Sequence, residues 1–311
     1  MKIKFTLPNF KESILVIVII TIFTVLTAAF IGFRPEHTLL IIIVCVLFFT
    51  TTTTRKLVVG LIPFIIFGIS YDWMRVFPNS MVNSIDIEPL YNLEKSLFGI
   101  VDNGEALIPC EYFARYNNAI SDFLTGIFYL GWVPIPIAFG FYLYIKKKYQ
   151  VFIRFSLVFL FVNILGFICY YIHPAAPPWY VMEYGFEPIL DTPGNMAGLS
   201  RFDDLIGIPI YSSIYGRNAN VFAALPSLHS AYLVIVLFYA FKSKCNIAIL
   251  TIIGVFLLGI WFTAVYTAHH YIIDVLLGIM CAVVGIILFE KVLMKLSFFK
   301  SFFNKYLSYV I

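Results

Sequence analysis

Residues 246–266 read NIAILTIIGVFLLGIWFTAVY, a stretch without a charged side chain. A helix that crosses the hydrocarbon core of a bilayer needs about 20 mainly apolar residues, and this stretch meets that requirement. The rest of the chain has the same character, since 61% of its 311 residues are hydrophobic and only 12% are charged. A water-soluble domain of this composition could not cover its own surface. We therefore expect an all-α fold, a polytopic membrane helical bundle.

Seven further stretches are apolar enough to span a bilayer, which predicts about eight transmembrane helices in a single membrane domain, residues 1–311. Two polar segments between them, roughly 75–118 and 173–224, are far longer than ordinary connections, and long loops of this kind usually carry function. The first apolar run is too long for a signal peptide and is interpreted as a retained anchor. The eight expected spans are 13–33, 38–53, 57–74, 119–144, 150–172, 225–241, 246–266 and 270–289.

The distribution of cations predicts the orientation, because lysine and arginine in short loops are retained on the cytoplasmic side. With the amino terminus inside, 15 of the 21 cations fall in inner segments and six in outer ones. Both termini are therefore expected in the cytoplasm, and both long loops on the extracytoplasmic face, periplasmic or lumenal. The formal charge of +4 comes from inner cations near lipid headgroups, and no basic face or reader motif indicates a nucleic-acid partner.

One histidine at the start of the last span is followed by an acid at helical spacing. His270 and Asp274 are four residues apart, so a helix places them on one face, whereas His269 points elsewhere. A carboxylate that accepts a hydrogen bond from one imidazole nitrogen fixes the tautomer and leaves the other nitrogen free to attack or to take a proton. The alternative is that Asp274 only caps the helix or pairs locally, which is a costly use of an acid in an apolar helix.

A second element, ALPSLHSA at residues 224–231, leaves the second long loop and enters a span. Pro226 is well placed in a first helical turn, and the free N–H groups there make a site for an anion. Ser227 could add a hydroxyl donor, and His229 could give a proton to a departing oxygen. A plain capped helix start is the alternative for this motif taken alone.

Arginine accounts for five of the six outer cations, and its planar guanidinium group suits bidentate phosphate binding. Arg75, Arg201 and Arg217 are the candidates for a phosphate clamp. The alternative is that the outer arginines pair with the acids of the same loops, as expected for Arg115 and Arg34. The residues expected to bind substrate are Arg75, Arg201, Arg217, Ser227, Asp72, Tyr180 and His269. Zinc-type spacing and acid-rich arrays are missing from the sequence, so we expect no metal and no cofactor.

The combination of Pro226-Ser-Leu-His229 with His270-x-x-x-Asp274 resembles signature stretches of the type 2 phosphatidic acid phosphatase superfamily, a group of helical-bundle membrane proteins. The match narrows to the inositol phosphorylceramide synthase branch. The stretches that carry this second resemblance are PPWY at 177–180, AGLSRFDD at 197–204, VFAALPSLHS at 221–230 and HHYIID at 269–274. An ordered set of motifs is far more specific than any one of them.

The resemblance implies that His270 forms a phosphohistidine, that Asp274 orients it and that His229 is the general acid for the leaving group. It also implies a division of the chain into N-terminal spans with the first outer loop (1–118), a catalytic phosphatase-like core (119–291) and a cytoplasmic tail (292–311). The sequence departs from the phosphatase pattern where Ala264 stands in place of arginine and Leu228 in place of glycine.

We therefore expect a membrane phosphotransferase that moves a phospho-headgroup, with phosphoinositol implied by the branch, from a glycerophospholipid to a lipid alcohol such as ceramide. Membrane lipids are its expected partners. A lipid phosphatase, in which water replaces the second alcohol, is the alternative within the superfamily. A lipid transporter or flippase is the alternative from another class, although such proteins usually keep ionisable groups near the midplane.

Overall fold

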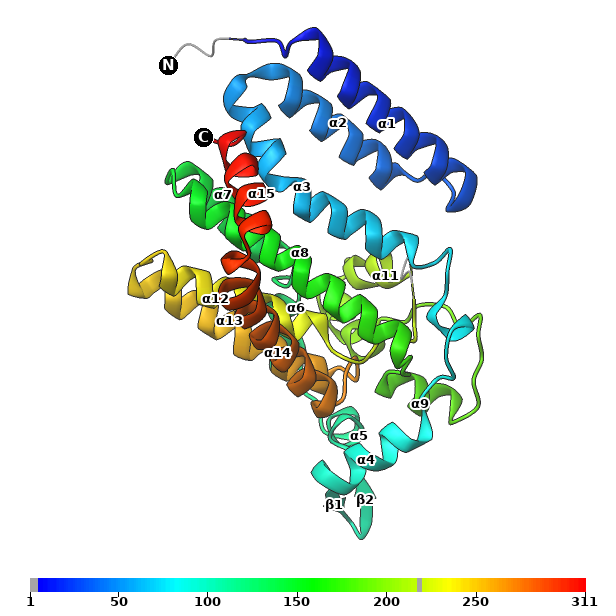
Figure 1. The fold of residues 1–311 in the computed structure, drawn as a ribbon. Coiled ribbons are helices and arrows are strands. Elements are labelled where there is room, and N and C mark those ends of the chain that lie inside the picture. Colours follow the sequence, from blue (N-terminus) through cyan, green and yellow to red (C-terminus); the bar gives the residue numbers. More distant parts are fainter. Residues whose placement is uncertain (1–4, 217–219) are drawn as a thin grey trace.

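The structure is a computed structural model that describes residues 5–216 and 220–311, and it is an all-α bundle (Figure 1). The expected helical membrane fold is confirmed. Eight helical regions correspond to the eight expected spans, and the chain is an integral membrane protein. Their helices are α1 (Phe10–Phe30), α2 (Pro35–Thr50), α3 (Thr52–Trp73), α6 (Ala119–Tyr129), α7 (Pro134–Ile145), α8 (Tyr149–Ile172), α12 (Leu228–Lys242), α13 (Ile247–Tyr266) and α14 (Ile272–Ile287).

Length and composition divide these regions into three groups. Helices α1, α3, α8, α13 and the region Ile272–Lys295 are each long and apolar enough to cross a membrane. Helices α2 and α12 are apolar but shorter, at 16 and 15 residues. Helices α6 and α7 meet at an angle of 44° and would together form one broken span. The expected span at 119–144 is thus bent in its middle, because Pro134 lacks the N–H that a continuing helix requires and instead begins α7.

The two ends of the bundle differ in character. One end, here called the loop end, carries segments 74–118, 173–216 and 220–227. At the opposite end, here called the lysine end, the hydroxyl of Tyr144 donates to the Thr53 carbonyl at 2.6 Å, and Lys242 pairs with Glu290 at 2.7 Å. The last residues also fold there, as α15 (Ser297–Ser308), where the Tyr306 hydroxyl donates to the Val59 carbonyl at 2.5 Å. The expected tail is thus largely a packed helix.

Helix α12 packs against α14, α13 and α8, while α1 and α2 lie at one edge of the bundle (Figure 1). Small residues allow close approach between membrane helices, where burial of apolar surface provides little attraction. A Cβ at Gly278 of α14 would lie 2.0 Å from the carbonyl oxygen of Ser227, which precedes α12. A Cβ at Gly166 of α8 would lie 2.6 Å from the Leu228 side chain. Glycine therefore fixes how closely the start of α12 sits between its two neighbours.

The two long segments at the loop end are joined by backbone hydrogen bonds. Asp86 N donates to the Pro174 carbonyl at 2.8 Å, and Ala175 N donates to the Phe222 carbonyl at 3.0 Å. These bonds place three distant stretches of the chain side by side.

The two long segments also contain short helices and strands. The first segment contains η1 (Asn79–Met81), α4 (Glu88–Phe98), β1 (Ile100–Asp102), β2 (Glu105–Leu107) and α5 (Pro109–Arg115). The second contains α9 (Pro178–Tyr184), η2 (Ala197–Leu199), α10 (Ser200–Ile206) and α11 (Ile210–Tyr215). Strands β1 and β2 form an antiparallel hairpin, and α14 continues through η3 (Leu288–Val292) and η4 (Leu293–Lys295).

The contact at Gly278 provides a test of this packing. We expect Gly278→Ala to lower the free energy of unfolding by about 1–3 kcal/mol, the usual cost of overpacking, because the new methyl group would overlap the Ser227 carbonyl. Thermal unfolding in detergent micelles measures the change. Gly254→Ala on α13 is the control, since its Cβ would meet nothing within 4 Å and alanine favours a helix. Equal midpoints for both variants would show that the α12–α14 contact is loose.

Candidate active site

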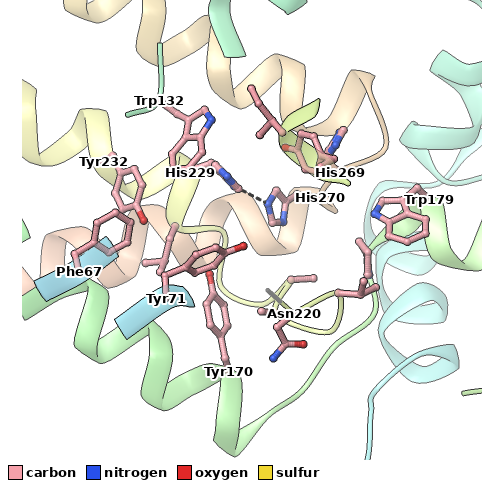
Figure 2. Close-up of a pocket in the computed structure, with 17 residues that line it drawn as sticks. Phe67, Tyr71, Trp132, Tyr170, Trp179, Asn220, His229, Tyr232, His269 and His270 are labelled. Carbon is pink, nitrogen blue, oxygen red and sulfur yellow. Dashed lines mark hydrogen bonds between the residues drawn. The ribbon is translucent and has the colours of Figure 1, made fainter. Parts of the chain in front are cut away.

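Three side chains from the starts of two helices, α12 and α14, follow one another at the loop end, and Figure 2 shows two of them, His229 and His270, with the dashed contact between their rings. His229 lies in the first turn of α12, and His270 lies in the turn between α13 and α14. His229 Nδ1 is 3.2 Å from His270 Nε2, and His270 Nδ1 is 3.4 Å from Asp274 Oδ2. The structure therefore brings together the three residues that the sequence analysis singled out for catalysis.

The pairing of His270 with Asp274 comes from a capping turn rather than from helical spacing. Helix α14 begins at Ile272, so His270 stands outside it, and Asp274 in the first turn accepts a hydrogen bond from Tyr271 N at 3.0 Å. Asp274 is fully buried, and its other oxygen, Oδ1, has no hydrogen-bond partner among the described residues. The carboxylate thus holds the turn and faces the imidazole at the same time.

The turn before α14 fixes the two adjacent histidines. The backbone N–H groups of His269 and His270 both donate to the Ala264 carbonyl, at 3.0 and 2.9 Å. Ala268 takes a φ of 58°, in the left-handed region that an alanine rarely adopts. Ala264 is itself fully buried, so the arginine of the phosphatase pattern would have no space here without rearrangement.

Burial keeps the imidazole of His270 neutral near pH 7. It lowers the pKa of His270 to about 4, and a backbone hydrogen bond with Ala224 opposes this shift. In the neutral tautomer with its proton on Nδ1, His270 donates to Asp274 and its Nε2 accepts from His229 Nδ1. The Nε2 lone pair is then the nucleophilic position, and it points toward His229.

His229 and His270 line a cavity of about 190 Å³, here called the histidine cavity. The ring of Trp132 meets His229 edge-on at 4.5 Å between centroids. Figure 2 shows the aromatic side chains around the two imidazoles. Among the described residues no lysine or arginine contributes to its wall. The aromatic and histidine residues of the lining are Phe67, Tyr71, Trp132, Tyr170, Trp179, Tyr215, Tyr232, His229, His269 and His270.

Of the residues expected to bind substrate, His269 lines the histidine cavity, and its Nδ1 lies 2.9 Å from the Thr267 hydroxyl. Ser227 is fully buried as the N-cap of α12 and accepts from Ser230 N. Tyr180 is also fully buried, and its hydroxyl donates to the Glu187 carbonyl at 2.6 Å. Neither side chain reaches the cavity wall. Their roles toward substrate remain predictions.

The arginines of the loop end that the structure describes do not line the histidine cavity. Arg75 pairs with Asp72 at 3.1 Å in a cluster that includes Arg34 and His37, at the loop end of α2 and α3. Arg201 pairs with Asp122 at 2.6 Å. Each therefore has an acidic partner, which is the alternative stated above for outer arginines.

Arg217, the third clamp candidate, lies outside the described residues. The phosphate clamp thus remains a prediction for all three arginines. Arg115 has the acidic partner expected for it, since it lies 2.6 Å from Glu105.

The structure adds one residue that the sequence analysis did not identify. Glu94 on α4 is fully buried, and its two carboxylate oxygens accept from Ile272 N at 2.8 Å and Ile273 N at 3.1 Å. Glu94 follows Leu90 and Tyr91 on the buried face of α4, and this periodicity is the signal that could have drawn attention to it. Glu94 caps the helix that carries Asp274.

Burial raises the pKa of Glu94 to about 7, the hydrogen bonds from Ile272 and Ile273 lower it, and the nearby Asp274 raises it. Buried Cys110 on α5 lies close by, where its thiol meets the His270 carbonyl at 3.6 Å. The first outer segment is therefore in direct contact with the turn that presents His270.

Comparisons with known proteins bear on this site. A profile of the PAP2 superfamily matches residues 107–288. The chain is 59% identical to the phosphoinositol dihydroceramide synthase of Bacteroides thetaiotaomicron over 304 residues, which cover 98% of this chain and 100% of the relative. It is 27% identical to the inositol phosphorylceramide synthase catalytic subunit of Saccharomyces cerevisiae over 223 residues, which cover 70% of this chain and 52% of the relative.

The chain is also 26% identical to the inositol phosphorylceramide synthase of Candida albicans over 227 residues, which cover 68% of this chain and 44% of the relative. It thus spans about half the length of the two fungal proteins. No solved structure matches it. The matches confirm the family resemblance read from the motifs.

The ionisation of Glu94 predicts a pH dependence of stability. Its pKa is about 7 in the folded protein and near 4.5 in an unfolded chain. Between pH 4.5 and pH 7 the folded protein therefore keeps Glu94 protonated, whereas the unfolded chain releases this proton. Raising the pH from 5 to 8 therefore lowers the free energy of unfolding through this group. The side chain in Glu94→Gln cannot lose a proton, so the thermal midpoint of this variant in detergent should not show the decrease from pH 5 to pH 8 that Glu94 causes.

Exposed Glu88 on the same helix provides the control. Glu88→Gln should keep the wild-type dependence on pH. If the difference in midpoint between wild type and Glu94→Gln is the same at pH 5 and pH 8, Glu94 does not titrate in this range, and burial does not raise its pKa to about 7.

Proposed function

We propose that this chain, which belongs to the PAP2 superfamily, is a membrane phosphotransferase that moves phosphoinositol from a glycerophospholipid to a ceramide-type alcohol through a phosphohistidine. The observation that carries the proposal is the contact of His270 Nε2 with His229 Nδ1 at 3.2 Å, with Asp274 on the far side of His270. A nucleophile, a proton donor and an orienting carboxylate are thus in line. The name of the 59% identical relative supports the headgroup and the acceptor.

In the first half of the reaction the phosphoryl group enters between the two imidazoles and separates them. His270 Nε2 attacks the phosphorus, and the bond from phosphorus to the diacylglycerol oxygen breaks. His229, protonated beside the anionic phosphodiester, gives its proton to that oxygen. Asp274 holds the Nδ1 proton of His270 and stabilises the positive charge that develops on the ring. The products are diacylglycerol and phosphoinositol bound to His270.

In the second half the same residues act in reverse. The acceptor hydroxyl gives its proton to His229 while its oxygen attacks the phosphorus, and the bond from phosphorus to His270 Nε2 breaks. The aromatic wall of the histidine cavity favours an acceptor with an apolar chain and excludes water from the intermediate. Water in place of this alcohol would make the protein a phosphatase.

The lysine end is the cytoplasmic end in this proposal, so the site faces the periplasm or a lumen and both termini are cytoplasmic. The excess of lysine and arginine in the segments at the lysine end supports this orientation. Residues 119–291 form the catalytic core. Residues 1–118 contribute Glu94 and the wall residues Phe67 and Tyr71 to it.

The products distinguish transfer from hydrolysis. Purified protein in proteoliposomes with labelled phosphatidylinositol should form acid-labile labelled protein, and added ceramide should yield a phosphoinositol-ceramide product. We expect His270→Ala to abolish the labelled protein and His229→Ala to slow transfer by about 10²–10⁴-fold, the usual contribution of a general acid.

Exposed His173, which pairs with Asp86 at 2.8 Å, is the matched histidine control. His173→Ala should retain wild-type transfer. Free inositol phosphate as the sole product, with and without ceramide, would assign the chain to the phosphatases. Full activity in His270→Ala would remove His270 as the nucleophile.

The low pKa of His270 predicts an unusual pH profile for the first half-reaction. Because the imidazole attacks in its neutral form and its pKa is about 4, the rate of phosphoenzyme formation in His229→Ala, which lacks the general acid, should stay nearly constant from pH 8 to about pH 5 and fall below that. Rapid-mixing measurements with labelled donor give this rate, and return to pH 7 checks that the protein has stayed folded. Half-maximal rate near pH 6.5, the ordinary value for histidine, would contradict the buried geometry.

A further inference from the structure

A second hollow of about 300 Å³ lies beside the histidine cavity, and Trp179 lines both. It is here called the outer hollow. Its walls come from α9, from the stretch 195–201 and from the end of α13 with the turn that follows it. The mechanism described above uses none of its polar side chains. These are Glu183, Asn195, Ser200, Arg201, Tyr266 and Thr267.

Arg201 presents a guanidinium group to this hollow. Its Nε donates to Asp122 at 2.6 Å, and its guanidinium carbon lies 5.2 Å from the centre of the Tyr266 ring. Its Nη2 is buried and has no hydrogen-bond partner among the described residues. A Cβ at Gly198 would lie 2.9 and 3.0 Å from the two terminal nitrogens, so only glycine leaves space for the guanidinium at this position. The arginine is thus held firmly but retains unused donor capacity.

An amide and a carboxylate face the same hollow. Asn195 Nδ2 donates to Glu183 Oε2 at 2.6 Å, and Asn195 Oδ1 accepts from Ala197 N at 2.6 Å. The hydroxyl group of Ser200 adds a group that can both donate and accept, whereas the buried Thr267 hydroxyl already donates to the Thr263 carbonyl at 2.7 Å. The outer hollow therefore offers a cation, an anion, an amide and a hydroxyl around an indole ring, whereas the histidine cavity is mainly aromatic.

This set of groups suits a ring that carries many hydroxyl groups. Neighbouring hydroxyls of a cyclitol each donate and accept, so they match a wall in which carboxylate and amide acceptors alternate with guanidinium and amide donors. The flat face of Trp179 can cover the carbon skeleton of such a ring. A diacylglycerol or a ceramide tail has no groups that would use these partners, so the hollow fits the headgroup rather than the lipid.

We propose that the outer hollow is the headgroup subsite, which binds the cyclitol ring while the phosphorus lies between His229 and His270. This inference rests on the proposed function. The walls of the hollow are tied to the catalytic turn, because Trp179 N donates to the Ala268 carbonyl and Gly198 N donates to the Thr267 carbonyl, both at 3.0 Å. The headgroup therefore stays in place on the phosphoenzyme while one lipid leaves and the other enters through the histidine cavity.

Binding of a soluble headgroup tests the subsite without turnover. The probe is myo-inositol 1-phosphate, with glycerol 1-phosphate as the comparison, and its dissociation constant is measured by calorimetry on the detergent-solubilised full chain. We expect Glu183→Gln and Asn195→Ala each to weaken binding of the inositol probe by about tenfold, as for one lost hydrogen bond. Binding of the glycerol probe should be weaker in the wild type and unchanged in both variants.

Two further measurements make the result specific. The same variants should lower kcat/KM for phosphatidylinositol by a similar factor and leave KM for ceramide unchanged, which a general loss of structure would not do. Exposed Glu187 lies in the same loop, and Glu187→Gln should behave as wild type. Arg201→Lys should also weaken binding, and because this residue is tied to Asp122 its thermal midpoint is measured alongside.

The two proposals fail in different ways. Wild-type affinity for myo-inositol 1-phosphate in both Glu183→Gln and Asn195→Ala would overturn the subsite, whatever the transfer activity. Failure of the wild type to form a ceramide-linked product would overturn the proposed function, and it would leave the binding measurement to decide the subsite separately.

Discussion

The start of α14 is a buried helix end, and the positions of His270 and Asp274 depend on which groups accept hydrogen bonds from its backbone N–H groups. The first N–H groups of any helix lack partners within the helix. Here two of them donate to Glu94, and the N–H of Tyr271 donates to Asp274. Asp274 is also the group that faces His270. These hydrogen bonds together determine where the helix begins and how the imidazole is oriented. Half of them involve Glu94, which lies 178 positions before Ile272 in the chain.

The sequence was sufficient to predict the elements that depend on local pattern. Apolar stretches of about 20 residues predicted the helical regions, and the spacing of His270 and Asp274 predicted their contact, although a capping turn rather than a helical face produces it. The bend before Pro134 was missed because the apolar run continues through it. Glu94 was missed because its importance depends on a distant helix end, and its place on the buried face of α4 with Leu90 and Tyr91 indicates burial but not the partner that it caps.

The arginines illustrate a further limit of reasoning from sequence. Residue type alone suggested that Arg75 and Arg201 bind a phosphate group. Each of them has an acidic partner that only the tertiary structure reveals. Partners also decide what such a group can still bind. The guanidinium of Arg201 keeps a buried nitrogen, Nη2, without a partner among the described residues. This nitrogen can donate a hydrogen bond to a hydroxyl group of a neutral polyol as well as to a phosphate oxygen. Two adjacent hollows, one lined mainly by aromatic side chains and the other also by charged and amide side chains, share the indole of Trp179.

The backbone bonds that join Asp86, Ala175 and Phe222 have a thermodynamic consequence for the two long outer segments. A free loop of some 40 residues carries considerable conformational entropy, which a ligand must reduce if it is to order the loop. Together with the bonds from Trp179 N to the Ala268 carbonyl and from Gly198 N to the Thr267 carbonyl, these bonds tie several points of the two segments to other parts of the chain. The entropy is therefore lost when the protein folds rather than when the lipids bind. The walls around the histidines are preorganised, so binding energy remains available for separating the two imidazoles and seating the phosphoryl group between them.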